Sequence, residues 1–410
     1  MNSGTRNAEP LGLYVHIPFC SAICNYCNFN RGLFDAAQKA RYVEALIREI
    51  SNCRMAGLQS GRIEYGRIED AALKSCHPAI LPSCNSADTI YFGGGTPSLL
   101  DPDDVARLVG ACRGAFEVSQ DVEVTLEANP ETVDEGKLTK FRAAGVNRLS
   151  FGVQSLLEPE LRRLSRLHTV GRAREALAEA RAAGFDNVSL DLMMWLPGQS
   201  VSQWLESVDA AMAISPDHLS LYLLEVYPNA PLKDEMARAQ WSQAPDDDAA
   251  SMYLTAMERL EAAGYEQYEI SNVARPGRRC RHNLKYWRDG EWAGFGCGAH
   301  GTIGGVRMKN VAGTDDYIGR VARGESPVAE ARRLSASERL GDALFMGLRL
   351  TDGIDLEEIA RHHDGVDVWQ KHGAELKPFL AAGILKRQGS RLALTRQGML
   401  VANEVMSVFV

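Results

Sequence analysis

The sequence lacks a long hydrophobic run, since no stretch approaches the roughly 20 apolar residues that a membrane-spanning helix needs. Its first ten residues, MNSGTRNAEP, also lack the basic and then apolar segments of a signal peptide. We therefore expect a cytoplasmic protein. A basic excess is missing too, because 45 Lys and Arg stand against 53 Asp and Glu, for a net charge of -8. Nucleic acid is thus not an expected partner.

Cysteines are few and unevenly spaced, nine in 410 residues. Since thiols stay reduced in the cytoplasm, this set favours metal or catalytic use over a disulfide framework. Six of the nine have no repeated ligand spacing, and we expect them to be structural or incidental: Cys53, Cys76, Cys84, Cys112, Cys280 and Cys297. The other three stand close together in the sequence.

Short β-type runs alternate with longer helical patterns through the first half of the chain, which is typical of βαβ units and a parallel sheet. Strands are predicted at residues 13–19, 89–93, 122–128, 148–153, 188–193 and 218–225. Helical segments are predicted between them, near 36–56, 102–116, 132–143, 157–183 and 201–213. The pattern predicts an α/β fold, a partial (β/α)6 barrel, with functional groups at the C-terminal ends of its strands.

A chain of 410 residues exceeds what one hydrophobic core usually organises, so more than one domain is expected. We predict a core barrel over residues 1–235, a connecting region over 236–305 and a C-terminal domain over 306–410. Residues 58–87 form a long polar segment, interpreted as a surface insertion of unknown role.

The last part of the chain predicts a mostly helical domain that resembles a winged helix. Helical patterns near 335–348, 355–362 and 366–382 precede LKRQGSRLALT, which predicts a two-stranded wing, and a final helix is expected to end at Val410. Residues 331–410 contain 11 Lys and Arg against 10 Asp and Glu, so the basic excess of a DNA-binding domain is missing. A packing or lid role is therefore favoured over a redox-sensitive DNA-binding regulator.

The three clustered cysteines lie in Cys20-Ser-Ala-Ile-Cys24-Asn-Tyr-Cys27, directly after the first predicted strand. Thiolate sulfur is the ligand that iron-sulfur clusters require, and a short loop can wrap a compact cluster. Three ligands leave one iron of a four-iron cluster open to a further molecule. Structural zinc is the competing interpretation, but it needs a fourth ligand nearby. His16 stands before the cysteines on the predicted strand, and no further ligand accompanies it there.

This CxxxCxxC spacing resembles the radical S-adenosylmethionine (SAM) superfamily. Gly93-Gly94-Gly95-Thr96-Pro97 follows the second predicted strand, and in that superfamily a glycine-rich segment there lies against the amino acid end of SAM. The resemblance implies a [4Fe-4S] cluster held by Cys20, Cys24 and Cys27. It also implies SAM binding by Tyr14, Tyr26, Gly94, Gly95, Thr96, Glu127, Gln154, Arg166 and Asp191. Taken singly, the polar residues at strand ends are more typical of buried hydrogen-bond partners or helix caps than of a binding site.

Within the superfamily the chain resembles the HemN-like branch over nearly its whole length, in YVHIPFC, YFGGGTPS, LEANPE, GVNRLSFGVQS, YEISN and the C-terminal block. That branch contains HemN-type oxygen-independent coproporphyrinogen III oxidases and HemW-type heme chaperones. The oxidases have a further cysteine two residues after the third ligand, and this chain has Phe29 there. The oxidases also have a long extension ahead of the cluster loop, whereas nineteen residues precede Cys20 in this sequence. Oxidase activity is therefore disfavoured.

His282-Asn283-Leu284-Lys285-Tyr286-Trp287 matches the HNxxYW motif of the HemW-type proteins, which is associated with heme. His282, Tyr286 and Trp287 are thus the candidate heme residues, because imidazole binds iron and aromatic rings pack on the apolar face. A packed aromatic core with a hydrogen-bonded histidine is the competing interpretation, and His300 is a weaker second candidate. The resemblance implies a chaperone that passes heme to acceptor proteins, including acceptors at the membrane surface; the alternative is a porphyrinogen-oxidising enzyme.

Overall fold

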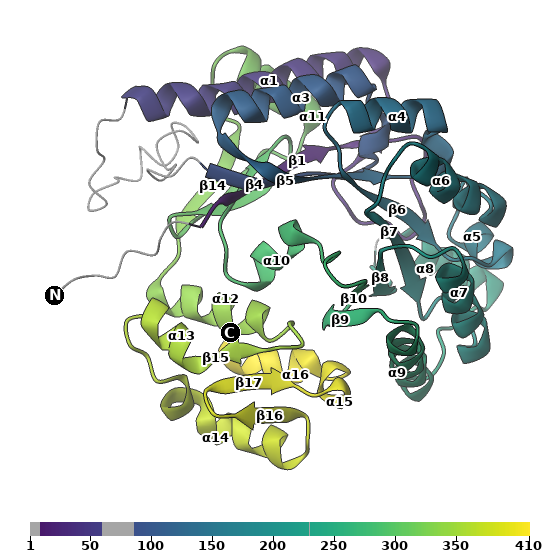
Figure 1. Cartoon of the computed structure of the whole chain (residues 1–410), viewed down its shortest axis with the longest axis vertical. Helices are drawn as coiled ribbons and strands as arrows, with labels where there is room; N and C mark the ends of the chain where they lie inside the picture. Colours follow the sequence, from purple (N-terminus) through teal and green to yellow (C-terminus); the bar gives the residue numbers. More distant parts are fainter. Residues whose placement is uncertain (1–8, 60–85, 229) are drawn as a thin grey trace. The chain divides into compact units, whose positions relative to one another are not determined.

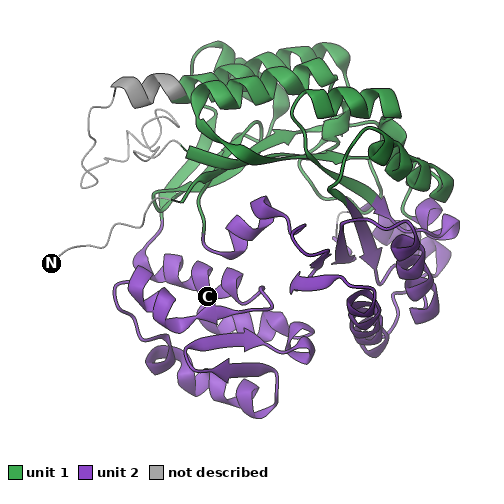
Figure 2. Cartoon of the chain, in the orientation of Figure 1, with its two compact units in different colours: residues 1–152, 164–188, 290–333 green, residues 153–163, 189–289, 334–410 purple. Residues whose placement is uncertain are grey.

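The computed structural model describes residues 9–59, 86–228 and 230–410. The chain forms two compact units (Figure 2). Unit 1 comprises Met1–Gly152, Leu164–Val188 and Gly290–Arg333, and unit 2 comprises Val153–Arg163, Ser189–Asp289 and Leu334–Val410. Almost all of the predicted insertion at 58–87, with Cys76 and Cys84, lies outside the described residues. The predicted domain boundaries at 235 and 305 stay predictions.

The sheet of unit 1 is built around four parallel strands, all of them predicted. In spatial order these are β1 (Leu11–Ile17), β4 (Ser86–Gly94), β5 (Glu117–Ala128) and β6 (Arg148–Gln154). Every residue of β1 except Tyr14 is buried, which is typical of a parallel strand covered on both faces.

Four short strands that the sequence analysis did not predict extend this sheet beyond β1. They are β11 (Trp292–Phe295), β12 (His300–Ile303), β13 (Val306–Asn310) and β14 (Val328–Arg333). β11 runs parallel to β1, whereas the other three continue antiparallel. A segment distant in sequence therefore lies beside the first strand.

Helices follow the parallel strands of unit 1, as expected for βα units. They are α1 (Ala36–Gln59), α3 (Pro102–Ala115), α4 (Glu135–Ala143) and α6 (Val170–Ala182). A further helix, α11 (Thr314–Ala322), follows the antiparallel strand β13. α1 packs on α3, α3 on α4 and α4 on α6. Figure 1 shows α1, α3 and α4 on the same side of β1, β4 and β5.

The single helix predicted over 157–183 is wrong, because the chain forms α5 (Glu158–Arg163) and then α6. Ser165 has a left-handed backbone with φ 54°, and the Thr169 side chain caps α6 by accepting from the Arg172 amide at 3.1 Å. The prediction failed because leucines at 161, 164 and 167 keep a helical spacing through the break. Arg166 consequently lies in a connecting loop.

In unit 2, β7 (Val188–Met194) and β8 (His218–Leu223) are the remaining predicted strands and pair in parallel. β10 (Asn272–Ala274) and β9 (Glu266–Glu269) continue antiparallel from β8. The helices between these strands and after them are α7 (Val201–Ala213), α8 (Pro231–Ala239), α9 (Asp246–Ala262) and α10 (Arg281–Trp287). α7 begins with a capping box of Ser200 and Gln203, at the predicted residue.

The C-terminal part of unit 2 confirms the predicted mostly helical domain with a wing. It contains α12 (Ala336–Gly347), α13 (Leu356–His362), α14 (Val368–Ala381) and a sheet in the order β15 (Ile354–Asp355), β17 (Arg391–Leu394), β16 (Leu385–Gln388). The final helix is wrong, since the chain instead makes α15 (Arg396–Met399), α16 (Ala402–Met406) and the 3-10 turn Ser407–Phe409. No helix among the described residues has the length and apolar character needed to span a membrane.

Candidate functional site

The three clustered cysteines lie on a loop of unit 1 that is closed at its base. Phe19–Cys20 (β2) pairs in parallel with Gly32–Leu33 (β3), and the Phe34 amide donates to the Cys20 carbonyl at 2.9 Å. Cys20 is buried, whereas Cys24 and Cys27 are half-buried. All three are free thiols, so the loop presents three sulfurs from one short, anchored segment.

Polar groups from other elements donate hydrogen bonds to two of these sulfurs. Thr96 Oγ1 lies 3.7 Å from Cys20 Sγ, and Arg166 Nη1 lies 3.3 Å from Cys24 Sγ. Arg166 also donates to Asn129 Oδ1 at 2.8 Å and to the Gly152 carbonyl at 2.6 Å. A cation and a hydroxyl beside sulfur stabilise its thiolate form, the form that binds metal.

Burial raises the pKa of the Cys20 thiol, an effect that the Thr96 hydrogen bond opposes. Burial likewise raises the pKa of the Cys27 thiol, opposed by a backbone hydrogen bond at Phe29 and by the Arg31 guanidinium. Burial also raises the pKa of the Tyr26 phenol, against the effect of nearby Arg166. Cys20 and Cys27 therefore hold their protons until a metal displaces them.

These residues fit a four-iron cluster better than a single zinc ion. Among the described residues, no three His, Cys, Asp or Glu side chains are arranged to hold one metal ion. In a four-iron cluster each cysteine binds a different iron, so its ligands need not converge on one point. The three thiols of the loop meet that requirement. Thr96 donates to the sulfur of Cys20, and Arg166 donates to the sulfur of Cys24.

The glycine segment after β4 lies directly against the end of β1. The amide of Gly95 donates to the Ile17 carbonyl at 2.8 Å, and that of Thr96 to the Phe19 carbonyl at 2.7 Å. Gly94 has φ 117°, and a Cβ there would come within 2.5 Å of the His16 ring. Glycine is thus required here by the chain's own packing, which joins the predicted SAM segment to the cysteine loop.

Tyr14 and Glu127 adjoin this segment, as the resemblance implied. Glu127 accepts from the Tyr91 hydroxyl at 2.8 Å and from the Gly94 amide at 3.0 Å. Tyr14 stacks on Tyr91 with ring centroids 6.2 Å apart, and its hydroxyl is hydrogen bonded to His16 Nδ1 at 3.1 Å. A Cβ on Gly93 would lie 3.0 Å from Tyr14 and 3.2 Å from Glu127. Glu127 and Tyr14 thus lie against the predicted SAM segment, and their part in SAM binding stays a prediction.

The other two predicted SAM residues belong to unit 2. Gln154 is the last residue of β6 and has a left-handed backbone with φ 70°. Asp191 is half-buried in β7, opposite Ser220 of β8. Their part in SAM binding stays a prediction.

Sequence reasoning missed the residues that anchor the far side of the cysteine loop. Asn30 Nδ2 donates to the carbonyls of Cys297 and Ala312, both at 3.1 Å, and the Asn30 carbonyl is hydrogen bonded to His16 Nε2 at 2.9 Å. Gly298 has φ 69°, and a Cβ there would come within 2.4 Å of the Asn30 amide. The segment at 296–298 therefore supports the loop, although the two lie far apart in sequence.

A buried carboxylate fixes that supporting segment. Glu49 of α1 accepts from the Gly296 amide at 2.8 Å, from Asn310 Nδ2 at 2.8 Å and from the Tyr317 hydroxyl at 2.6 Å. The glycine-rich run GFGCGAHG, at residues 294–301, is the sequence signal for this support. His300, the weaker heme candidate within it, is exposed at the start of β12. Cys297 is buried, as expected of a structural cysteine.

The HNLKYW segment forms α10 of unit 2, and its histidine is enclosed. The His282 side chain is buried, and its Nε2 is hydrogen bonded to the Tyr286 hydroxyl at 2.8 Å. Trp287 packs against a cluster of Tyr268, Ala274 and Leu284. In this conformation the segment is a packed aromatic cluster with a hydrogen-bonded histidine, so coordination of iron by Nε2 requires that it release Tyr286.

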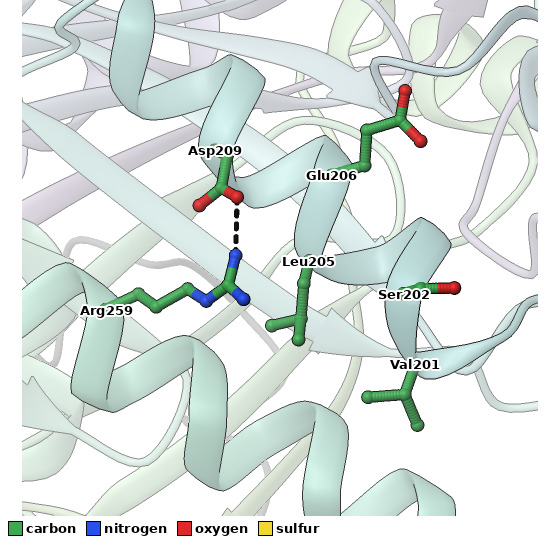
Figure 3. A pocket seen from close by; sticks show the side chains of 6 residues that line it. All are labelled: Val201, Ser202, Leu205, Glu206, Asp209 and Arg259. Atoms are coloured by element: carbon green, nitrogen blue, oxygen red, sulfur yellow. Dashed lines mark hydrogen bonds and ion pairs between the residues drawn. The ribbon is translucent and has the colours of Figure 1, made fainter.

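A shallow groove of about 520 Å³ lies elsewhere in unit 2, along α7 and α9. Figure 3 shows Arg259 of α9 paired with Asp209 of α7 on one wall. The remainder of the groove is lined by Val201, Ser202 and Leu205, among others. None of the predicted cofactor residues lines this groove.

Comparison with known proteins gives matches along the whole chain. The sequence model of the radical SAM superfamily matches residues 83–211, and that of the HemN C-terminal domain matches 334–401. The heme chaperone HemW of Bacillus subtilis is 34% identical over 97% of this chain and 98% of its own length. The heme chaperone HemW of Mycobacterium tuberculosis is 38% identical, over 97% and 94%. The coproporphyrinogen III oxidase HemN of Escherichia coli, a radical SAM enzyme, has a similar fold, with a TM-score of 0.81, 23% identity and coverage of 99% and 91%.

Proposed function

The chain belongs to the HemW family of the radical SAM superfamily, and we propose on this basis that it binds heme and passes it to acceptor proteins. The observation that carries the proposal is full-length similarity to relatives named heme chaperones, in a chain that has the aromatic α10. The acceptors are proteins at the membrane surface or in the cytoplasm, where we also expect this chain.

A [4Fe-4S] cluster on Cys20, Cys24 and Cys27 and SAM are the proposed cofactors. The cluster supplies, when bound, an iron with an open position and an electron for SAM. The chain's own residues hold the loop and its charge: Arg166 places a cation at Cys24, and Thr96 donates to Cys20. Glu127, which accepts from the Gly94 amide, is the proposed contact for the amino acid part of SAM.

Heme is the proposed cargo of α10. The Tyr286 and Trp287 rings, 6.2 Å apart, offer apolar surface for a tetrapyrrole, and His282 offers an imidazole once Tyr286 releases it. Uptake thus needs a local rearrangement of the His282–Tyr286 pair.

An oxidase of the HemN type is the second candidate, and the fold similarity to HemN speaks only for a shared fold. Phe29 occupies the position of the additional oxidase cysteine, and its side chain is 69% exposed. A phenyl ring cannot ligate iron or exchange a proton there, so this residue favours the chaperone.

Equilibrium titration with heme tests the proposal. We expect one heme per chain, with Trp287→Ala weakening the affinity about tenfold or more through lost apolar contact. Trp369→Ala is the matched control, because Trp369 is another tryptophan of unit 2 stacked by an arginine, Arg387, at 4.3 Å. The absence of saturable heme binding by the wild type would overturn the proposal.

A further inference from the structure

The YEISN segment, at residues 268–272, resembles the HemN-like branch but has no assigned role. The side chain of Glu269 is fully buried, and its Oε2 forms an ion pair with Nη2 of Arg349 at 3.0 Å. Glu269 also accepts from the Ser271 amide at 2.9 Å and from Asn272 Nδ2. Burial raises the pKa of Glu269, and the Arg349 guanidinium opposes that rise. A buried carboxylate therefore holds an arginine in a fixed position.

The backbone around Arg349 is equally fixed. The Arg349 carbonyl accepts from the Ile270 amide at 3.0 Å, and the Thr351 amide donates to the Tyr268 carbonyl at 3.2 Å. Between them, Leu350 forms an isolated antiparallel β-bridge with Glu269. The guanidinium carbon of Arg349 then lies 4.4 Å from the centre of the Trp287 ring. The YEISN segment thus places a cation on the last residue of HNLKYW.

Two donors of this pair are buried without an acceptor among the described residues. They are Nε of Arg349 and Nε1 of Trp287, on side chains that are themselves only half-buried. A buried N–H without an acceptor costs on the order of 1–3 kcal/mol, so such groups usually meet an acceptor in use. A cationic guanidinium over an indole ring, each with an N–H that lacks an acceptor, selects a carboxylate.

We propose that Arg349 and Trp287 Nε1 form a carboxylate subsite that receives a propionate of heme, with Glu269 positioning the arginine. This rests on the proposed function, because it assigns a polar contact to the same cargo. The apolar face of the tetrapyrrole lies against the aromatic rings of α10, and the propionate at its edge meets the two donors. The subsite distinguishes heme from apolar ring systems that carry no acid.

The test compares heme with its dimethyl ester, in which both propionates are neutral. Wild-type protein should bind the ester about tenfold more weakly than heme, as loss of a charge-assisted hydrogen bond implies. Trp287→Phe keeps an aromatic ring but removes the N–H, so it should weaken heme binding about tenfold more than it weakens ester binding. The heme spectrum should not change, since neither donor is an iron ligand.

Arg349→Met alone leaves the Glu269 carboxylate buried and unpaired, so Arg349 is tested in the Glu269→Gln/Arg349→Met double variant. The amide oxygen that Glu269→Gln introduces can still accept from Ser271 and Asn272, and the double variant should fold and show the same selective loss of heme affinity. Arg387→Met with Trp369→Phe is the control pair. Equal wild-type affinity for heme and ester, or an equal loss for both ligands in the variants, would overturn the subsite while leaving heme binding intact. A wild type that binds neither ligand would overturn the proposed function together with the subsite.

Discussion

At the scale of single residues, the hydrogen bond between His282 and Tyr286 occupies the ring nitrogen that is proposed to bind the heme iron. We expect His282→Ala to change the heme absorption and spin state, because an imidazole ligand is lost. Tyr286→Phe removes this hydrogen bond from Nε2 and should keep the spectrum without loss of affinity. Absorption spectra of both heme-loaded variants check this. If Tyr286→Phe instead removes the wild-type bands while His282→Ala keeps them, the phenol oxygen and not the imidazole is the ligand.

The cysteine thiols give a second expectation at this scale. Their raised pKa values mean that Cys20 and Cys27 are protonated in the metal-free loop at neutral pH, so binding of iron must release protons. Cluster assembly should therefore strengthen as pH rises, by up to about tenfold in affinity per unit for each proton released. Iron and sulfide content after anaerobic reconstitution between about pH 6.5 and 8.5 measures it.

Cys24→Ala should abolish cluster assembly at every pH, whereas Cys112→Ala should leave the iron content unchanged, since Cys112 is buried in α3. Stoichiometric zinc in the anaerobically purified protein would contradict the assignment of these thiols.

At the scale of elements, the cysteine loop depends on a supporting segment that lies far from it in sequence. Asn30→Ala removes two hydrogen bonds to the carbonyls of Cys297 and Ala312, each worth about 1 kcal/mol. We expect faster loss of iron to a chelator from the reconstituted variant. Asn28→Ala is the matched control, since Asn28 is an exposed asparagine of the same loop. Equal rates of iron loss from the two variants would show that the anchor does not hold the cluster loop.

The elements show which features a sequence can reveal. The six parallel strands were predictable because each contains a short β-type run between helical patterns, such as LGLYVHI. The strands β11 to β14 were not, since each is six residues or fewer and depends on pairing with β1 or with one another. The break before α6 was missed because Ser165 and Thr169 act through backbone conformation and capping, which the leucine spacing conceals.

The site divides in the same way. Cysteine spacing and the glycine run were visible in sequence, and the structure places Tyr14, Thr96 and Glu127 of the predicted set around them. Asn30 was invisible because its partners lie more than 250 residues away. The burial of His282 was also beyond prediction, since it depends on how α10 packs.

At the scale of the whole molecule, the two proposed binding sites belong to different units: the cysteine loop to unit 1 and α10 to unit 2. We therefore expect Cys24→Ala to retain heme binding and Trp287→Phe to retain a full complement of iron. Paired iron analysis and heme titration of both variants check this. Loss of both cofactors from either variant would show that the cluster and heme sites are coupled.

The most direct test of the central claim uses the anaerobically reconstituted protein, with SAM and a reductant present, and compares its action on a porphyrinogen with its binding of heme. Coproporphyrinogen III and heme are supplied in parallel reactions, and porphyrin products and bound heme are measured. We expect stoichiometric heme binding and no decarboxylation of the porphyrinogen, because Phe29 replaces the additional oxidase cysteine. Accumulation of protoporphyrinogen over many turnovers, without heme binding, would contradict the chaperone function and establish an oxidase.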